Sequence, residues 1–265
     1  MSDIPVVLSL AGLDPTGGAG LQADIEALAS MGCHAAPVIT AVTVQDTRNV
    51  IRFEPVSAEL VMEQARAVLE DIRVAAIKIG MVGSVETAEA IHSLLKDYPD
   101  IPVVLDPILK AGGGSLLASE ELTHAIRSLL LPLTTLTTPN SEEARQLAPE
   151  ADSLTACAES LQDIGCRYVL ITGSHEPTVE VINTLYGRHQ LLEIYPCKRL
   201  AGEYHGSGCT LASAATGLLA QGIDIVDACR HAQEYTWASL QNGYRIGMGQ
   251  LIPDRFSWTD HDTEA

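Results

Sequence analysis

The sequence of 265 residues has few aromatic side chains, which together make up 4% of it, and it has no basic run. Its formal net charge is −18. Because nucleic acids and anionic membrane surfaces attract positive charge, neither is an expected partner of this chain. No apolar run approaches the roughly 20 residues that a membrane-spanning helix requires. Such an acidic chain is expected to bind phosphates only through local features, such as helix ends, metal ions and a few basic side chains.

The cysteines show neither a CxxC pair nor the spacing of a metal site, and no signal peptide is recognisable. There are six of them: Cys33, Cys157, Cys166, Cys197, Cys209 and Cys229. We therefore expect reduced thiols and a cytoplasmic location. All except Cys209 are interpreted as small buried hydrophobic residues.

Short apolar segments alternate with amphipathic ones, which predicts βαβ units and a mostly parallel sheet covered on both faces. The predicted strands are residues 5–11, 35–44, 75–79, 101–105, 133–137 and 167–171, followed by a hairpin of 179–186 and 190–195. The predicted helices are residues 21–31, 58–72, 85–96, 120–131, 141–147, 154–164 and 225–242. We expect one domain over residues 1–265, an α/β fold built as a three-layer α/β/α sandwich, with a frayed tail at 259–265.

Polar and glycine residues follow the predicted strands, where ligands bind in open α/β sheets. They are the loop 12–20, Gln45, the segment 80–83, Asp106, Asn140 and Thr172. The carboxyl ends of parallel strands share one edge, so these residues are expected to gather there.

A glycine-rich turn before a run of small residues, 205–217, is the strongest chemical signal in the chain. Such a turn at a helix start presents unpaired N–H groups to an anion, above all a phosphate. The candidate catalytic residues are Gly206, Ser207, Gly208 and Cys209, and the helix dipole is expected to lower the pKa of the Cys209 thiol. His205 either orients this anion site or merely ends the preceding loop.

Oxygen ligands at strand ends are suited to Mg²⁺ with bound phosphates, usually through water. Asp106, Asn140 and Glu143 are the candidates; alternatively, Asn140 only caps a helix that has Glu143 in its first turn. Thr172 either lines a nucleotide site or forms a turn.

Two further side chains are suited to a flat heterocycle, although each has a structural alternative. The Gln45 amide both donates and accepts, as a heterocycle edge requires, but it could be an exposed loop residue. Met81 could cover a ring or belong to the core. For the Asp24 carboxylate, the structural alternative is simple solvation.

Six segments together resemble the hydroxymethylpyrimidine/phosphomethylpyrimidine kinases of thiamine biosynthesis, within the ribokinase-like superfamily. They are LAGLDPTGGAGLQADI (10–25), VITAVTVQDT (38–47), IKIGMVGS (77–84), VVLDP (103–107), TPNSEEA (138–144) and HGSGCTLASA (205–214). The resemblance implies a homodimer that uses ATP and Mg²⁺ to phosphorylate 4-amino-5-hydroxymethyl-2-methylpyrimidine and then its monophosphate.

The resemblance also implies roles for individual residues. It places Gly12, Ala19, Gln45 and Met81 around the pyrimidine, with Asp24 near it. It places Asp106, Asn140 and Glu143 on the side of Mg²⁺ and the ATP phosphates, where Asp106 and Glu143 would hold the metal, mainly through water. Gly206, Ser207 and Gly208 would form the anion hole, with Cys209 as the proton acceptor.

The chain departs from the usual pattern of these kinases at Thr172-Gly173, where many members have a lysine before the glycines. Lys110 is a candidate replacement for that charge, and the segment 247–255 has no assigned purpose. Three rivals remain: a pyridoxal kinase of the same fold, a cysteine hydrolase with Cys209 as nucleophile and His205 as base, and an inactive ligand-binding relative.

Overall fold

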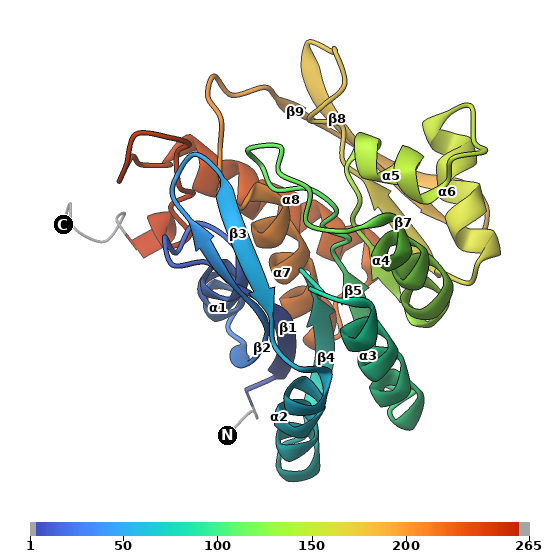
Figure 1. Cartoon of the computed structure of the whole chain (residues 1–265). Coiled ribbons are helices and arrows are strands. Elements are labelled where there is room, and N and C mark those ends of the chain that lie inside the picture. The colour runs from blue at the N-terminus through green and yellow to red at the C-terminus, as the bar shows by residue number, and fades with distance from the viewer. Residues whose placement is uncertain (1–3, 260–265) are drawn as a thin grey trace.

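The computed structural model describes residues 4–259, which contain a sheet of nine strands in the order β3-β2-β1-β4-β5-β6-β7-β8-β9 (Figure 1). Neighbouring strands from β2 through β7 are parallel, whereas β3, β8 and β9 pair antiparallel. The strands are β1 (Val6–Leu13), β2 (His34–Gln45), β3 (Val50–Pro55), β4 (Val74–Ile79), β5 (Val103–Leu105), β6 (Leu136–Thr137), β7 (Tyr168–Ile171), β8 (Glu180–Gly187) and β9 (Gln190–Lys198). Apart from Thr259, the predicted tail lies outside the described residues.

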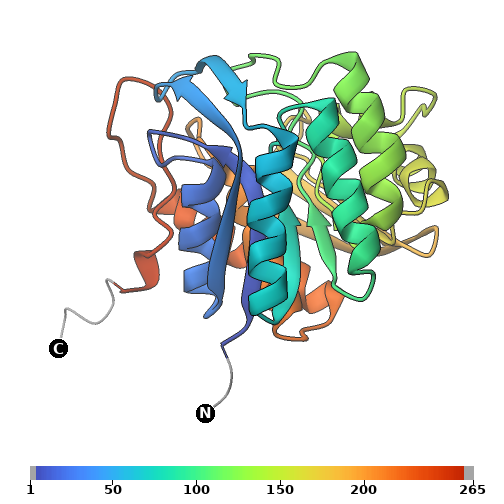
Figure 2. The same ribbon diagram turned by 60° about the horizontal axis from the view of Figure 1, so that its bottom comes forward.

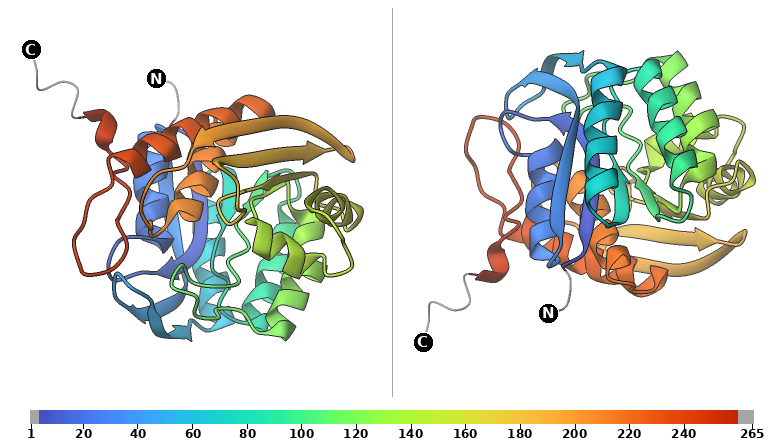
Figure 3. Two further views of the ribbon diagram at one scale, coloured as in Figure 1. Left: turned by 90° about the horizontal axis from the view of Figure 1, so that it is seen from above. Right: turned by 90° about the horizontal axis from the view of Figure 1, so that it is seen from below.

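Helices cover both faces of this sheet, as Figures 2 and 3 show. One face carries α2 (Ala58–Asp71), α3 (Val85–Asp97), α4 (Glu120–Ala125), α5 (Ser141–Leu147) and α6 (Leu154–Asp163). The other carries α1 (Gly20–Ser30), α7 (Ser207–Ala220) and α8 (Ile225–Gln241). The predicted three-layer α/β/α sandwich is therefore confirmed. None of the described helices combines the length and apolarity needed to cross a bilayer.

The period of two along the short strands explains how each contributes to two cores. In β5, Val103 and Leu105 pack under α2–α6, while Val104 between them packs under α7 and α8. All three side chains are buried. Strands that bury both faces have few polar positions, which is why these segments are short and apolar in the sequence.

Two elements differ from the predictions. Strand β3 was not expected, because four of its six residues are exposed and the charged Arg52 and Glu54 face solvent at the sheet edge. The predicted helix 120–131 is α-helical only as far as Ala125, and a π-helical turn, Ile126–Leu130, and a short 3₁₀ turn follow. Pro132 lies in that 3₁₀ turn; since proline has no N–H, it cannot continue α-helical hydrogen bonding.

Candidate active site

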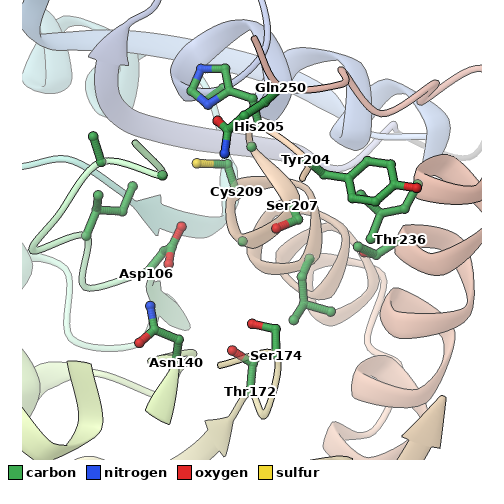
Figure 4. Close-up of a pocket in the computed structure, with 18 of the residues that line it drawn as sticks. Asp106, Asn140, Thr172, Ser174, Tyr204, His205, Ser207, Cys209, Thr236 and Gln250 are labelled. Atoms are coloured by element: carbon green, nitrogen blue, oxygen red, sulfur yellow. The ribbon is translucent and has the colours of Figure 1, made fainter. Parts of the chain in front are cut away.

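A cavity of about 440 Å³ lies at the carboxyl ends of the parallel strands, in the range that small-molecule sites occupy (Figure 4). Almost all of the residues predicted to form the site line it together. They are Gly12, Ala19, Gln45, Met81, Asp106, Asn140, Glu143, Thr172, Gly206, Ser207, Gly208 and Cys209. Asp24 is the exception.

The start of α7 forms one wall of the cavity. Gly206 precedes the helix with a φ of 78°, a left-handed conformation that favours glycine, and it has no side chain to cap the helix. The first N–H groups of α7 therefore have no side-chain partner where Ser207, Gly208 and Cys209 line the cavity. This geometry is that of an anion-binding helix start.

Asp106 faces the start of α7, and Figure 4 shows its carboxylate directed into the same space. A methyl group added to Gly208 would lie 3.9 Å from both carboxylate oxygens. Asp106 is only 4% exposed, and within residues 4–259 its Oδ2 has no hydrogen-bond partner. Burial raises the pKa of Asp106 to about 6, although the nearby ammonium of Lys78 opposes this shift.

Asn140 and Glu143 form a capping box at the start of α5. The structural alternative, in which Asn140 caps a helix that has Glu143 in its first turn, is therefore correct. The Asn140 side chain accepts from the N–H of Glu143 at 2.9 Å, and the Glu143 side chain accepts from the N–H of Asn140 at 2.9 Å. Both residues nevertheless line the cavity. Burial and the charge of Asp106 raise the pKa of Glu143 to about 8.

Burial makes the carboxyl groups of Asp106 and Glu143 hard to ionise, and Asp106 Oδ2 has no hydrogen-bond partner within the described residues. Both features suit a cation bound between the protein and a phosphate, because a cation stabilises the ionised carboxylates. Within the described part of the chain, no three His, Cys, Asp or Glu side chains cluster as a metal site of their own. Asp106 and Glu143 are the two residues that could hold Mg²⁺, with water and phosphate oxygens as further ligands of the kind that this ion prefers.

The pKa of Cys209 is shifted in the direction opposite to the prediction. The residue is 6% exposed, and its burial raises the pKa to about 12 even though Lys78 acts to lower it. The charge near a helix start falls off quickly and does not outweigh the cost of burying a thiolate here. Cys209 is therefore a neutral thiol in the free protein.

Asp24 does not line the cavity, so the structure does not support a direct contact between Asp24 and a substrate bound there. Its side chain is fully buried and accepts hydrogen bonds from Lys78 Nζ at 2.9 Å, Ser213 Oγ at 2.7 Å and Ser9 Oγ at 2.7 Å. With these donors around it, the carboxylate is a structural partner of a buried lysine. The sequence offered one signal: Lys78 is a single charge within an apolar strand.

His205 pairs with Asp14, at 2.7 Å between Nε2 and Oδ2. Asp14 also accepts from the N–H groups of Thr16 and Ala19. Burial alone would raise the pKa of Asp14, but these hydrogen bonds and His205 outweigh it and lower the pKa. His205 thus joins the loop 12–20 to the start of α7, which does not support its role as a base for Cys209.

Several residues of the cavity wall escaped prediction because they come from segments without a sequence signal. They include Ser174, Lys198, Arg199, Tyr204, Thr236, Trp237 and Gln250. Arg199 donates to the carbonyls of Ser174, Glu176 and Thr178, which fixes the loop after β7 at the rim of the cavity. Lys110 also lines the cavity, and its Nζ lies 3.7 Å from Glu142 Oε2.

A three-layer sandwich in which a helix start faces a buried carboxylate suits a phosphotransferase of the ribokinase-like fold. The comparisons with known proteins agree and go further. The phosphomethylpyrimidine kinase family matches residues 14–254, and the chain belongs to this family.

Individual relatives cover nearly the whole chain. A hydroxymethylpyrimidine/phosphomethylpyrimidine kinase of Streptomyces coelicolor is 38% identical over 262 residues, which cover 96% of this chain and 95% of the relative. The ADP complex of Bacillus subtilis pyridoxal kinase superposes with a TM-score of 0.89 at 26% identity, covering 97% of this chain and 99% of that one. A Clostridium difficile phosphomethylpyrimidine kinase gives a TM-score of 0.77 at 32% identity, covering 89% and 98%.

Proposed function

We propose that this protein transfers the γ-phosphoryl group of ATP to the hydroxymethyl oxygen of 4-amino-5-hydroxymethyl-2-methylpyrimidine, and a second phosphoryl group to the monophosphate. The observation that carries the proposal is the meeting, in one cavity, of the α7 start with the carboxylate of Asp106 and with Gln45 and Met81. The family membership supports the same reaction. The product is the diphosphate used in thiamine biosynthesis.

Phosphoryl transfer depends mostly on positioning and on stabilising negative charge in a loose transition state. We assign the stabilising role to the N–H groups at Gly206, Ser207, Gly208 and Cys209, which are fixed before the reaction begins. Asn140 and Thr172 line the wall where the ATP phosphates would lie. Gly12 and Ala19 contribute backbone surface on the pyrimidine side.

Asp106 and Glu143 are assigned to Mg²⁺. When bound, this ion neutralises charge on the phosphate oxygens. Its arrival would also remove the cost of ionising two buried carboxyl groups, because a cation stabilises both carboxylates. Asp106 Oδ2, which has no hydrogen-bond partner within the described residues, would be available to this ion.

Cys209 is assigned to accept the proton of the substrate hydroxyl. As a neutral thiol in the free protein, it first has to release its own proton to solvent in the cavity, and the thiolate then accepts the proton of the substrate hydroxyl. The assignment therefore requires binding of the reactants to change its surroundings, and it predicts a rate that increases with pH over the neutral range.

Pyridoxal kinase activity is the second candidate, since a pyridoxal kinase is among the structural neighbours. Its substrate is likewise a flat heterocycle with a hydroxymethyl group. Parallel assays with both alcohols at equal concentrations discriminate between the two. We expect the higher kcat/KM with the pyrimidine; a higher value with pyridoxal would overturn the proposed substrate.

We further propose that the protein is a cytoplasmic homodimer. The edge strand β3 and its neighbour β2 expose the apolar side chains of Val42, Val44 and Ile51, and Ile51 is 73% exposed. A second copy of this surface could cover them. Light scattering of the purified protein tests this; a monomer at micromolar concentration would contradict it.

A further inference from the structure

The segment 243–255 near the end of the chain lies against the loops that form the active site. Figures 1 and 2 show it, in red, beside the first helix and strands in blue. The N–H of His205 donates to the carbonyl of Leu251 at 2.9 Å, and the N–H of Leu251 donates to that of Glu203 at 2.9 Å. The backbone directly before the anion hole is therefore paired with this segment.

Arg255 ends the segment and is 1% exposed. Its guanidinium group makes three contacts in different directions. Nε donates to the hydroxyl of Thr210 at 2.9 Å, Nη2 donates to the carbonyl of Gly18, and Nη1 pairs with Glu26 Oε2 at 2.9 Å. Glu26 balances the charge, and each of the three guanidinium nitrogens of this buried arginine has a partner.

Two of these contacts lead to the two glycine-rich loops. Gly18 belongs to the loop 12–20, whose Gly12 and Ala19 line the substrate side of the cavity. The hydroxyl of Thr210 donates in turn to the carbonyl of Gly206 at 2.8 Å. Gly206 itself lies against Gly18, because a methyl group on Gly206 would approach the Gly18 carbonyl oxygen to 2.0 Å.

The glycines themselves have no side chains with which to fix the relative position of the two loops. The His205–Asp14 pair is one link between the loops, and Arg255 supplies a second. We propose that Arg255 is a positioning residue for phosphoryl transfer, which sets the substrate loop against the anion hole so that the acceptor hydroxyl meets the phosphoryl group. Arg255 does not line the cavity and acts only through Gly18 and Thr210. The inference rests on the proposed kinase function.

The chemistry of this position requires arginine. The planar guanidinium holds several donors at fixed angles and keeps its charge at every physiological pH, whereas a lysine could reach only one of the two loops at a time. Small displacements matter here, since a shift of about 1 Å in the reacting groups can cost about 100-fold in rate.

The test measures a ratio of two rates within one enzyme preparation. The rate of ATP hydrolysis by water is divided by the rate of phosphoryl transfer from ATP to the alcohol. Transfer needs both loops in register, whereas hydrolysis needs only the anion hole. In Arg255→Met we therefore expect this ratio to rise at least about tenfold, with a smaller rise in Arg255→Lys. A purely structural role would lower the amount of folded enzyme and leave the ratio unchanged.

Thr210→Val removes the hydroxyl that connects Arg255 to Gly206, so it should raise the ratio as well. Because both substitutions break the same connection, the ratio of the double variant Arg255→Met/Thr210→Val should exceed that of Arg255→Met by less than about twofold. Arg230→Met, which removes an arginine paired with Asp227 on α8, is the matched control and should leave the ratio unchanged. If Arg255→Met does not fold, Arg255→Lys and Thr210→Val carry the test.

An unchanged ratio in these variants, while wild type phosphorylates the alcohol, overturns the role of Arg255 and leaves the proposed function intact. A wild-type protein that phosphorylates neither the pyrimidine nor pyridoxal overturns both.

Discussion

Lys78 Nζ lies 2.9 Å from Asp24 Oδ1, and both side chains are completely buried. Ser9 and Ser213 complete the surroundings of the carboxylate, so the pair links β1, β4, α1 and α7 behind the active site. Burial acts to lower the pKa of Lys78, but the charge of Asp24 and the other acidic groups outweighs it and raises the pKa. The lysine is therefore charged, and its field opposes the upward pKa shifts of Asp106 and Cys209.

Removing one partner of this pair leaves an uncompensated buried charge. Lys78→Met is expected to lower the free energy of unfolding by about 3–5 kcal/mol, measured by urea denaturation. The double variant Lys78→Met/Asp24→Leu should lose less than the single one, because no lone charge remains. Arg52→Met, which breaks the exposed pair with Glu54, is the control and should cost less than about 1 kcal/mol.

Cys209→Ala should separate catalysis from binding. If the thiol accepts the substrate proton, kcat should fall about 100-fold or more, while the Kd of the pyrimidine stays nearly constant. Steady-state kinetics and calorimetry measure the two quantities. Cys157→Ala, a buried cysteine on α6 outside the cavity, is the control. An unchanged kcat in Cys209→Ala would show that this residue is not the proton acceptor.

Gln45 is expected to recognise the heterocycle. Gln45→Ala should raise KM for the pyrimidine about tenfold, since a lost hydrogen bond to a bound ligand costs about 1–1.5 kcal/mol. The kcat at saturation should change little, because the residue is not placed at the reacting oxygen. Kinetic constants for the pyrimidine and pyridoxal that both match wild type would rule out this role.

The magnesium requirement should depend on pH in a definite direction. The free Glu143 has a pKa of about 8 and Asp106 of about 6, so protons compete with the metal below these values. The Mg²⁺ concentration for half-maximal velocity should therefore fall as the pH rises from 6.5 to 8.5. Glu143→Gln should make this Mg²⁺ concentration depend less on pH. Because ATP titrates equally in both assays, an identical pH dependence in the variant and the wild type would contradict the assignment.

Most of the fold follows from the sequence, because short apolar segments followed by glycine or polar residues mark buried parallel strands. The edge strand β3 could not be predicted, because its mostly exposed positions impose no regular alternation of apolar and polar residues. The cavity-lining residues at strand ends could be predicted, because parallel strands present those ends at one edge. The roles assigned to them stay predictions.

The properties of three residues could not be predicted from the sequence: the partner of Asp24, the pKa of Cys209 and the contacts of Arg255. The partner of Asp24 comes from β4, 54 residues along the chain. The pKa of Cys209 depends on how deeply α7 is buried, and the local motif gives no measure of that depth. Arg255 contacts the loop 12–20 from the far end of the chain, 237 residues after Gly18. Each of these relationships is created by packing between distant segments.

Mass spectrometry of the products formed from ATP, Mg²⁺ and 4-amino-5-hydroxymethyl-2-methylpyrimidine tests the central claim most directly. We predict the pyrimidine monophosphate at early times and the diphosphate on longer incubation. Recovery of the unmodified alcohol under conditions in which the protein phosphorylates pyridoxal would contradict it.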